Sequence, residues 1–428
     1  MKVLVVGGGS GGHITPAIAA VREILALKPR TRVEFWTDRK YYANVVKITT
    51  EIGVSWGEKS RLSGKKQYVQ VKKIWAGKFH RYNWKFTDYF ENFSITLKDV
   101  IWGNICGFFG FAGGVLQSLF RLLRKSKRPD VIFLKGGFVG LPVGVVAKWL
   151  KIPYVVHESD AVPGLANRIL MKKAVIVAQG VPFSMPSADD MSEKAEAIRK
   201  VRKNWRFTGI PVAPEFRPVS AARQKQLKKA FGFDPSRPLV VITGGSQGAA
   251  HINETVREIL PEMLKFASVG LVAGREKYEE MVDLKQYEDW EKAKLQSDFR
   301  LWSFCSTMNE LMGAADVVVS RAGATTIAEL AGLGKAVILV PFEKLPGGHQ
   351  VKNADRLAEQ GAAAVIYDER MLKEPELLLE LTKKLVRSPK LRAELAANLH
   401  EVANPAAAAE LAKIVLKVGA ASERTNSR

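Results

Sequence analysis

Side chains that could transfer protons occur at two points of the chain. His157, Glu158 and Asp160 follow the apolar run at 154–156, and His13 ends a glycine-rich segment. Carboxylates and imidazoles are the usual general acids and bases of enzymes. His13, Glu158 and Asp160 are therefore the candidate catalytic residues. The alternative for the two acids is that they only cap loops or helix ends, and the alternative for His13 is that it only binds phosphate or caps its helix.

Glycine-rich segments that could bind phosphate occur twice. The first, GGGSGGH at 7–13, lies between an apolar strand pattern at 2–6 and a helical pattern that starts at 14. A strand, a glycine turn and a helix leave backbone N–H groups at the positive end of the helix, where phosphate binds. The segment also fits the dinucleotide motif G-x-G-x-x-G, and Asp38 lies where a dehydrogenase carries its ribose-binding acid.

The second segment, GGSQGA at 244–249, follows a strand pattern at 238–243 and precedes a helix that starts near Ile252. Two such segments, far apart in the chain, predict an α/β protein with two Rossmann-like domains facing each other across a cleft. This arrangement favours a nucleotide-sugar transferase over a dehydrogenase.

A third strand, small-residue turn and helix start lie at 316–329. We expect Glu329 on the first turn of that helix, where its carboxylate could accept hydrogen bonds from both ribose hydroxyls of a nucleotide. Compensation of the helix dipole is the alternative.

A chain of 428 residues, 47% of them hydrophobic, is long enough for two domains with separate cores. We expect the domains at 1–212 and 213–402, with 207–212 as a strand and hinge. A helix at about 403–418 is expected to pack back on the first domain, and 421–428 to form a disordered tail.

The charge is distributed unevenly between the two expected domains. The chain carries +22, of which residues 1–212 contribute +20. Such a field attracts anionic lipid, polyphosphate or nucleic acid, and nucleic acid is the weaker choice because no nucleic-acid module accompanies the charge. Only two cysteines are present, Cys106 and Cys305, and the first apolar run is too short for a secretory signal. We therefore expect a reducing cytoplasm.

Two neighbouring stretches of the first domain favour contact with a membrane. Residues 59–87 contain nine basic residues, no acidic residue and several aromatic residues, among them Trp75 and Phe79. This combination suits lipid headgroups. Residues 100–120 then carry no charge, and five basic residues follow at 121–128. The uncharged stretch is long enough to cross a bilayer. A crossing would separate strands of one sheet, so we expect an interfacial or re-entrant segment, with a core helix as the alternative.

Taken together, the motifs closely resemble the MurG family of glycosyltransferases over nearly the whole chain, to about residue 417. The resemblance rests on GGGSGGH (7–13), KGGFVG (135–140), HESDAVPGLAN (157–167), TGIPV (208–212), GGSQGA (244–249), SRAGATTIAE (320–329) and HQVKNA (349–354).

The resemblance implies a GT-B fold and an inverting transfer of GlcNAc from UDP-GlcNAc to the C4 hydroxyl of MurNAc in lipid I, which gives lipid II for peptidoglycan synthesis. The N-terminal domain would bind lipid I and the C-terminal domain UDP-GlcNAc, on the cytoplasmic face of the membrane. The fold requires no cofactor or metal, although a divalent cation such as Mg²⁺ could stimulate the reaction. No nucleic-acid partner is implied.

The resemblance also implies roles for particular residues. Ser10, Gly11 and Gly12 would contact the acceptor pyrophosphate and the donor sugar, Ser246 and Gln247 the donor phosphates, the Cys305 backbone the uracil, Glu329 the ribose, and Gln350 the GlcNAc hydroxyls. The further substrate contacts implied are Asn167, Ala324, Thr325, Thr326, Ile327 and Ala328.

The sequence departs from the family pattern in two places. Members often carry an arginine directly after the T-G-x-P-V segment, where this chain has Ala213. Either another cation takes its role, with Arg217 and Arg275 as candidates, or the donor binds more weakly. The segment before Asp130 is also longer than usual.

Three alternatives remain open at this stage. One is a GT-B transferase that glycosylates another membrane lipid, such as diacylglycerol. Another is a UDP-sugar epimerase, which would not need the apolar basic surface. The third is a membrane-binding protein without enzymatic activity, which would not need two glycine-rich segments and Glu329.

Overall fold

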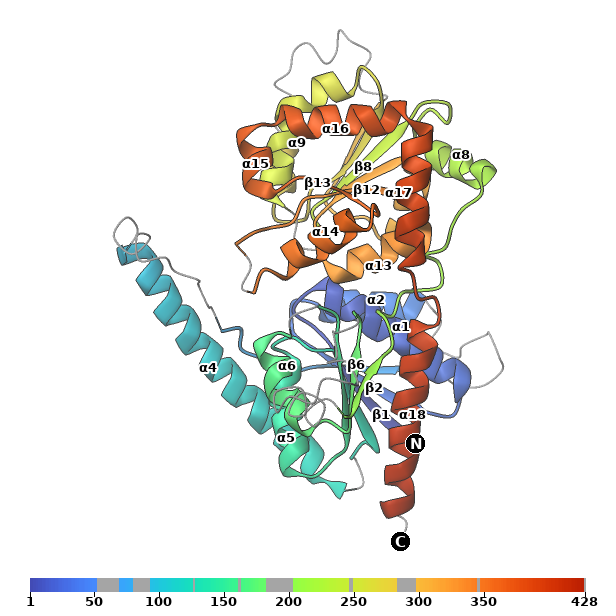
Figure 1. Ribbon diagram of the computed structural model, residues 1–428. Coiled ribbons are helices and arrows are strands. Elements are labelled where there is room, and N and C mark those ends of the chain that lie inside the picture. Colours follow the sequence, from blue (N-terminus) through green and yellow to red (C-terminus); the bar gives the residue numbers. More distant parts are fainter. Residues whose placement is uncertain are drawn as a thin grey trace, which may run out of the picture. The chain divides into compact units, whose positions relative to one another are not determined.

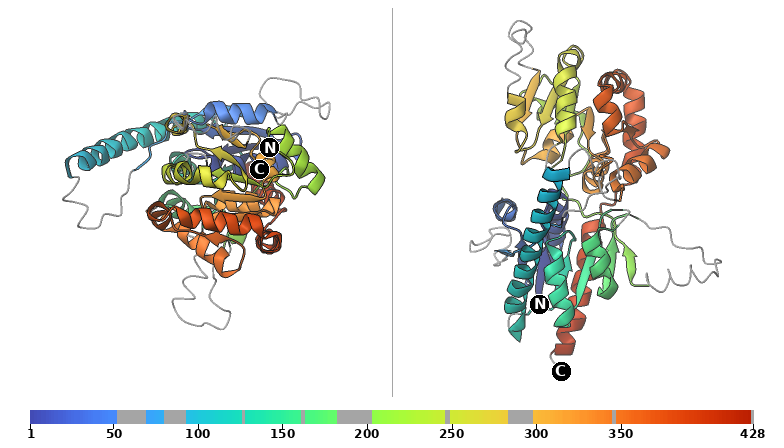
Figure 2. Two further views of the ribbon diagram at one scale, coloured as in Figure 1. Left: turned by 90° about the horizontal axis from the view of Figure 1, so that it is seen from above. Right: turned by 90° about the vertical axis from the view of Figure 1, so that its left-hand side faces the viewer.

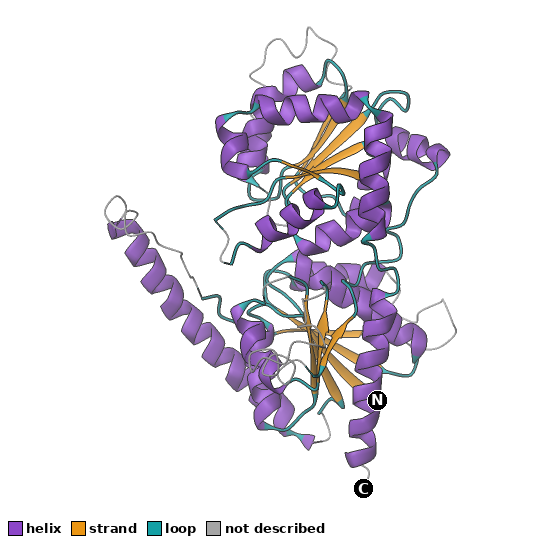
Figure 3. Cartoon of the chain, viewed as in Figure 1, coloured by secondary structure: helices purple, strands orange, loops and turns teal. Residues whose placement is uncertain are grey.

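The computed structural model describes residues 1–51, 69–79, 93–125, 128–160, 163–181, 203–245, 249–282, 298–344 and 347–426. The chain folds into two compact units (Figure 1). Unit 1 comprises Met1–Ala213 and Ala406–Arg428, and unit 2 comprises Pro214–Pro405. In each unit a sheet lies between layers of helices (Figure 3).

The sheet of unit 1 has seven parallel strands in the order β3-β2-β1-β4-β5-β6-β7. The strands are β1 (Lys2–Val6), β2 (Arg32–Thr37), β3 (Val69–Lys73), β4 (Val131–Leu134), β5 (Tyr154–Glu158), β6 (Ile176–Gln179) and β7 (Trp205–Phe207). The helices are α1 (Gly11–Leu27), α2 (Tyr42–Glu51), α4 (Phe93–Leu123), α5 (Gly140–Trp149), α6 (Leu165–Leu170) and α18 (Ala407–Asn426), with the 3-10 turn η2 (Met171–Lys173).

Side chains alternate between the two faces of β1, because successive residues of a strand point to opposite sides. Val3 and Val5 pack with α1 and α18 on one face. Leu4 and Val6 pack on the other face with residues of α5 and with Leu122 at the end of α4. The sheet is therefore covered on both sides, as a parallel sheet requires.

The sheet of unit 2 has six parallel strands in the order β10-β9-β8-β11-β12-β13. The strands are β8 (Leu239–Thr243), β9 (Ser268–Val272), β10 (Phe299–Trp302), β11 (Val317–Ser320), β12 (Ala336–Leu339) and β13 (Ala364–Val365). The helices are α8 (Ala221–Ala230), α9 (Ala250–Met263), α10 (Tyr278–Val282), α12 (Met308–Ala314), α13 (Ala324–Leu333), α14 (His349–Glu359), α15 (Asp368–Lys373), α16 (Glu376–Arg387) and α17 (Pro389–Glu401).

Both strand orders reverse direction once, between β1 and β4 in unit 1 and between β8 and β11 in unit 2. In open parallel sheets, ligands bind outside the carboxyl ends of the strands at such a switch point. Residues 7–12 follow β1, and residues 244–249 follow β8. Each glycine-rich segment therefore begins at the switch point of its own unit.

The uncharged stretch at 100–120 lies within one continuous helix, α4, which extends away from the strands of its unit (Figures 1 and 2). Within the described residues, one helical segment, Trp102–Leu123, is long and apolar enough to cross a membrane. Only 22% of its apolar window is buried, which argues against the core-helix alternative.

The glycines of α4 form its contact with the extended segment 74–79. A Cβ atom on Gly114 would collide with the Trp75 carbonyl, and one on Gly77 would collide with the Gly107 carbonyl. Next to this contact, Gln117 Oε1 accepts a hydrogen bond from Trp75 N at 2.9 Å. The small residues thus allow one side of α4 to lie directly on the chain, while the larger apolar side chains occupy its other sides.

Two details differ from the expectations. Residues 208–212 are not a strand, because β7 ends at Phe207. The expected disordered tail at 421–428 is also wrong, because α18 continues to Asn426. Leu411 and Val415 anchor α18 in the core of unit 1, and Glu423 pairs with the terminal amino group of Met1 at 3.4 Å.

Candidate active site

The glycine-rich segment of unit 1 is held by an acid of its own unit. Asp38, which follows β2, accepts a hydrogen bond from Gly9 N at 2.7 Å and another from Tyr41 N at 3.2 Å. A Cβ atom on Gly8 would collide with the same carboxylate. Asp38 thus anchors the loop, and this role argues against its use as the ribose-binding acid of a dinucleotide site.

His13 lies in the first turn of α1, where its backbone N–H donates to Ser10 O at 3.2 Å. A Cβ atom on Gly137 would lie 3.0 Å from the imidazole Cδ2, so the absence of a side chain there makes room for the ring. Nδ1 is buried and has no hydrogen-bond partner within the described residues. Burial, helped by the charge of Lys135, lowers the pKa of His13 to about 3, so the ring is neutral at physiological pH.

Lys135 directly follows β4 and is almost completely buried. Its Nζ donates a hydrogen bond to Ser159 Oγ at 2.7 Å. Burial lowers the pKa of Lys135 to about 8, against the opposing influence of Glu158 and Asp160, so the side chain is cationic at neutral pH. Lys135 was not predicted as a site component. Its position between an apolar strand and two glycines could have indicated such a role.

Glu158, at the end of β5, uses both carboxylate oxygens to organise the loop that follows. Oε1 accepts from Asp160 N at 3.0 Å, and Oε2 accepts from Gly164 N at 3.2 Å and from Asn167 Nδ2 at 2.9 Å. Burial, followed by repulsion from Asp160, raises the pKa of Glu158. These contacts match the capping alternative that the sequence left open for this residue.

Asn167 and His157 complete this edge of unit 1. Asn167 Nδ2 also donates to His157 O at 3.3 Å, which leaves Asn167 Oδ1 buried without a partner among the described residues. His157 Nε2 donates to Gly209 O at 2.9 Å and ties β5 to the chain after β7. Asp160 is only partly buried and follows Ser159. Among the described residues here, Asn167 Oδ1 and His157 Nδ1 are buried without a partner and Asp160 is partly exposed, so these groups are candidates for contact with a ligand.

The glycine-rich segment of unit 2 is only partly described. Ser246 and Gln247, the expected phosphate contacts, lie outside the described residues. Next to them, Gly245 N donates to Thr243 Oγ1 at 3.2 Å, and α9 begins at Ala250. No acidic residue lies in the first turn of α9.

The helix after β11, α13, begins farther ahead of Glu329 than expected. Gly323 is the N-cap of α13, so residues 324–328 form its start and Glu329 is the sixth residue, beyond the first turn. The expected first-turn position is therefore wrong, and compensation of the helix dipole weakens with it, since that effect is confined to the first turn. Burial raises the pKa of Glu329 to about 8.

The residues 324–328 divide into two groups by burial. Ala324 and Ile327 pack into the core of unit 2, whereas Thr325, Thr326 and Ala328 are partly exposed. Side chains of the first group can reach no ligand, so any substrate contact they make comes from their backbone.

Cys305 and Gln350 lie on two other loops of unit 2. Cys305 is partly buried next to the exposed Phe304, whose ring is covered by the guanidinium of Arg275 at 4.6 Å. Arg275 is one of the two candidates to take the role of the arginine that this chain lacks at position 213. Its guanidinium makes a cation–π contact here. Gln350, the second residue of α14, accepts from Phe342 N at 3.0 Å through Oε1, which directs its amide nitrogen to other partners.

Two models of glycosyltransferase family 28 match the chain in tandem, the N-terminal domain over residues 3–179 and the C-terminal domain over 239–412. A UDP-N-acetylglucosamine–N-acetylmuramyl-(pentapeptide) pyrophosphoryl-undecaprenol N-acetylglucosamine transferase of Listeria welshimeri is 32% identical over 420 residues, which are 98% of this chain and 99% of the relative. The chain belongs to the MurG family of glycosyltransferases.

Other relatives and structures agree with this family. The enzyme of the same name from Bacillus cereus strain ATCC 10987 is 33% identical over 372 residues, 86% of this chain and 87% of the relative. Among solved structures, Acinetobacter baumannii MurG covers 97% of this chain and 99% of its own with a TM-score of 0.61 at 22% identity. The calicheamicin glycosyltransferase CalG4 superposes with a TM-score of 0.55 at 14% identity. These likenesses confirm the predicted two-domain GT-B fold. The residue roles inferred from the MurG resemblance stay predictions.

The contacts of Glu158 predict that its replacement affects stability before chemistry. Glu158→Gln keeps the size but cannot accept from three donors, and a buried donor without an acceptor costs about 1–3 kcal/mol. We expect a lower free energy of unfolding in urea for Glu158→Gln. The matched change Asp160→Asn, at a partly exposed neighbour, should stay within about 0.5 kcal/mol of wild type. Equal stability of the two variants would contradict the loop-organising role.

Proposed function

We propose that this chain transfers GlcNAc from UDP-GlcNAc to the C4 hydroxyl of MurNAc in lipid I, undecaprenyl-pyrophosphoryl-MurNAc-pentapeptide, and so forms lipid II. The observation that carries the proposal is the near full-length similarity to the Listeria welshimeri transferase named for this acceptor. Two glycine-rich segments at two switch points support it, because the reaction involves a diphosphate in both substrates.

The reaction needs a base for the attacking hydroxyl and groups that stabilise the leaving UDP. We assign the base to unit 1, to His13 or Asp160. His13 offers a neutral ring with a buried, unpartnered Nδ1, and Asp160 offers a carboxylate at the same edge of the sheet. Glu158 is the weakest of the three sequence candidates, since its oxygens already accept three hydrogen bonds.

The low pKa of His13 bears on which residue is the base. A base with a pKa near 3 removes a hydroxyl proton poorly at neutral pH. The pyrophosphate of lipid I, bound near the first glycine-rich segment, would offset the charge of Lys135 and raise the pKa of the ring. His13 would then become a better base only after the acceptor has bound.

The donor is assigned to unit 2. Residues at the start of α13 would offer backbone N–H groups, Glu329 would accept from the ribose, the Cys305 backbone would meet the uracil, and the Gln350 amide would donate to the GlcNAc hydroxyls. Stabilisation of the leaving diphosphate would come from the amides of the second glycine-rich segment, as in other preorganised anion sites.

Transfer of radiolabel from UDP-GlcNAc tests the proposed reaction. Label should move to lipid I and not to diacylglycerol. Label in diacylglycerol would identify the other lipid transferase, and conversion of the sugar without any acceptor would identify an epimerase.

The raised pKa of Glu329 predicts a pH dependence of donor binding. Ribose hydroxyls donate hydrogen bonds, so they bind the ionised carboxylate, which forms as the pH rises towards about 8. The affinity of the protein for UDP should therefore increase with pH up to about 8 and then level off, by at most about tenfold per pH unit. Calorimetry on wild type and Glu329→Gln separates this effect from ionisation of the nucleotide itself. The same pH dependence in both proteins would remove Glu329 from the ribose site.

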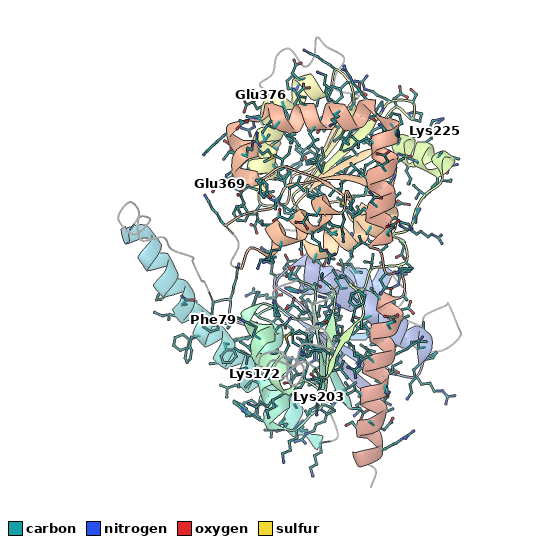
Figure 4. The ribbon with its side chains drawn as sticks, viewed as in Figure 1. Phe79, Lys172, Lys203, Lys225, Glu369 and Glu376 are labelled. Atoms are coloured by element: carbon teal, nitrogen blue, oxygen red, sulfur yellow. The ribbon has the colours of Figure 1, made fainter. Side chains whose placement is uncertain are left out.

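We also propose that unit 1 binds the cytoplasmic face of an anionic membrane through α4 and the extended segment 74–79. Trp102, Phe108, Phe109, Leu116 and Phe120 are exposed on α4, and Phe120 is 73% exposed. Trp75 and Phe79 lie exposed beside them, with Phe79 6.3 Å from Phe111 between ring centroids (Figure 4). So many large apolar side chains exposed on one helix are unusual for a protein that has no partner.

Exposed basic residues lie close in sequence to these apolar side chains. Arg124 and Lys125 follow α4, and Lys78 precedes Phe79, whereas Arg121 is turned to the Lys73 carbonyl, to which it donates at 3.0 Å. Each basic residue near an anionic surface contributes about 1 kcal/mol, and salt screens this share but not the apolar share.

High salt should therefore release the protein only partly from vesicles that contain anionic lipid. Phe108→Glu with Phe109→Glu, at positions 58% and 67% exposed, should complete the release in salt and leave the melting temperature nearly unchanged. Vesicle flotation measures the release, and a circular-dichroism melt measures the melting temperature. Undiminished flotation of the folded double variant in high salt would contradict docking through α4.

A further inference from the structure

A buried ion-pair network lies at the carboxyl edge of the sheet of unit 2. Its members come from four segments that are distant in sequence. His251 is in the first turn of α9, Arg321 follows β11, Phe342 follows β12, and Asp368 is the first residue of α15. The parallel order of β8, β11, β12 and β13 brings these segments to one edge.

Asp368 is the centre of this network. Its side chain is 1% exposed, and each of its oxygens has a partner, His251 on one side and the cationic Arg321 on the other. Oδ2 accepts from His251 Nδ1 at 2.6 Å, and Oδ1 pairs with Arg321 Nη1. A carboxylate this deeply buried is tolerated only when it is paired and hydrogen-bonded.

The orientation of Arg321 and His251 is fixed by further contacts. Arg321 Nη1 also donates to Val340 O at 3.2 Å, and its guanidinium lies 5.2 Å from the centroid of the Phe342 ring. The ring of His251 meets the same phenylalanine edge-on at 6.2 Å. Phe342 N in turn is bound by Gln350 Oε1 at 3.0 Å. The network therefore links the start of α9 to the loop that carries Gln350.

The charge of Asp368 is already balanced by Arg321, so His251 is not needed for charge balance. The His251 side chain is 32% exposed, whereas Arg321 is 12% exposed. Because Nδ1 is committed to Asp368, Nε2 is the nitrogen through which the exposed part of the ring can donate to a ligand.

We propose that His251 binds a phosphoryl oxygen of the donor diphosphate through Nε2, with Asp368 and Arg321 as positioning residues. The inference rests on the proposed function, which assigns the nucleotide to this edge of unit 2. The first turn of α9 contains no acidic residue that would compete for His251.

The comparison of UDP with uridine tests this contact, because only UDP carries phosphates. His251→Gln keeps a donor for Asp368 and removes the ring nitrogen Nε2. We expect its affinity for UDP to fall by about 10- to 100-fold, the range of one charge-assisted hydrogen bond, with the affinity for uridine unchanged. Both are measured on the full chain by displacement of a fluorescent UDP analogue. Lys265→Gln, which removes one exposed charge from the same unit, is the matched control and should bind both ligands like wild type.

Asp368→Asn tests the positioning role, since it keeps the shape of the side chain and weakens its hold on His251. It should also lower the affinity for UDP more than that for uridine, and a thermal melt reports whether the variant is folded. Equal losses for UDP and uridine in folded His251→Gln, or no loss for either, would overturn the proposal.

The outcomes also separate this inference from the proposed function. If wild type binds UDP through His251 but transfers no label to lipid I, the acceptor assignment fails and the phosphate contact stands. If His251→Gln binds UDP like wild type and still glycosylates lipid I, the contact fails and the function stands.

Discussion

The parallel register of the two central strand pairs is the constraint on which the candidate site depends. Val6 pairs with Leu134 at the ends of β1 and β4, and Thr243 pairs with Ser320 at the ends of β8 and β11. Because these pairs end level with each other, the loops that follow leave the sheet at the same edge. Each loop then meets the start of a helix, where N–H groups have no partners within the helix. In unit 1 the glycines are needed, because a Cβ atom on Gly8 would collide with the Asp38 carboxylate and one on Gly9 with the Phe138 ring.

Buried charge is the second feature that the two units share. Unit 1 holds Lys135 against Ser159 and Glu158 against three donors, and unit 2 holds Asp368 between Arg321 and His251. Such groups cannot leave their partners without an uncompensated charge in a medium of low polarity. They keep the loops in one arrangement before any substrate binds. Preorganisation of this kind lowers the cost of stabilising charge during a reaction.

The sequence predicted those features that have a local signal. Apolar runs followed by glycines marked the strand ends at Val6 and Thr243, and motif order indicated the family and the two-domain fold. Contacts between distant residues were not predictable. The hydrogen bond from Lys135 to Ser159 depends on the register of β4 and β5. The hydrogen bond from Gly9 N to Asp38 depends on the register of β1 and β2. Helix ends were also misjudged, since packing of α18 on α1 extends a helix beyond its apolar residues. The roles of Ser246 and Gln247 stay predictions.

The loop edge of unit 1 is proposed to supply the base for glycosyl transfer. Single-turnover rates of His13→Ala and Asp160→Ala, at saturating UDP-GlcNAc and lipid I, test this proposal, with UDP affinity measured in parallel. We expect the transfer rate of at least one variant to fall by about 10²–10⁴-fold while UDP binds as in wild type. Near-normal transfer rates in both variants would show that neither residue is the base.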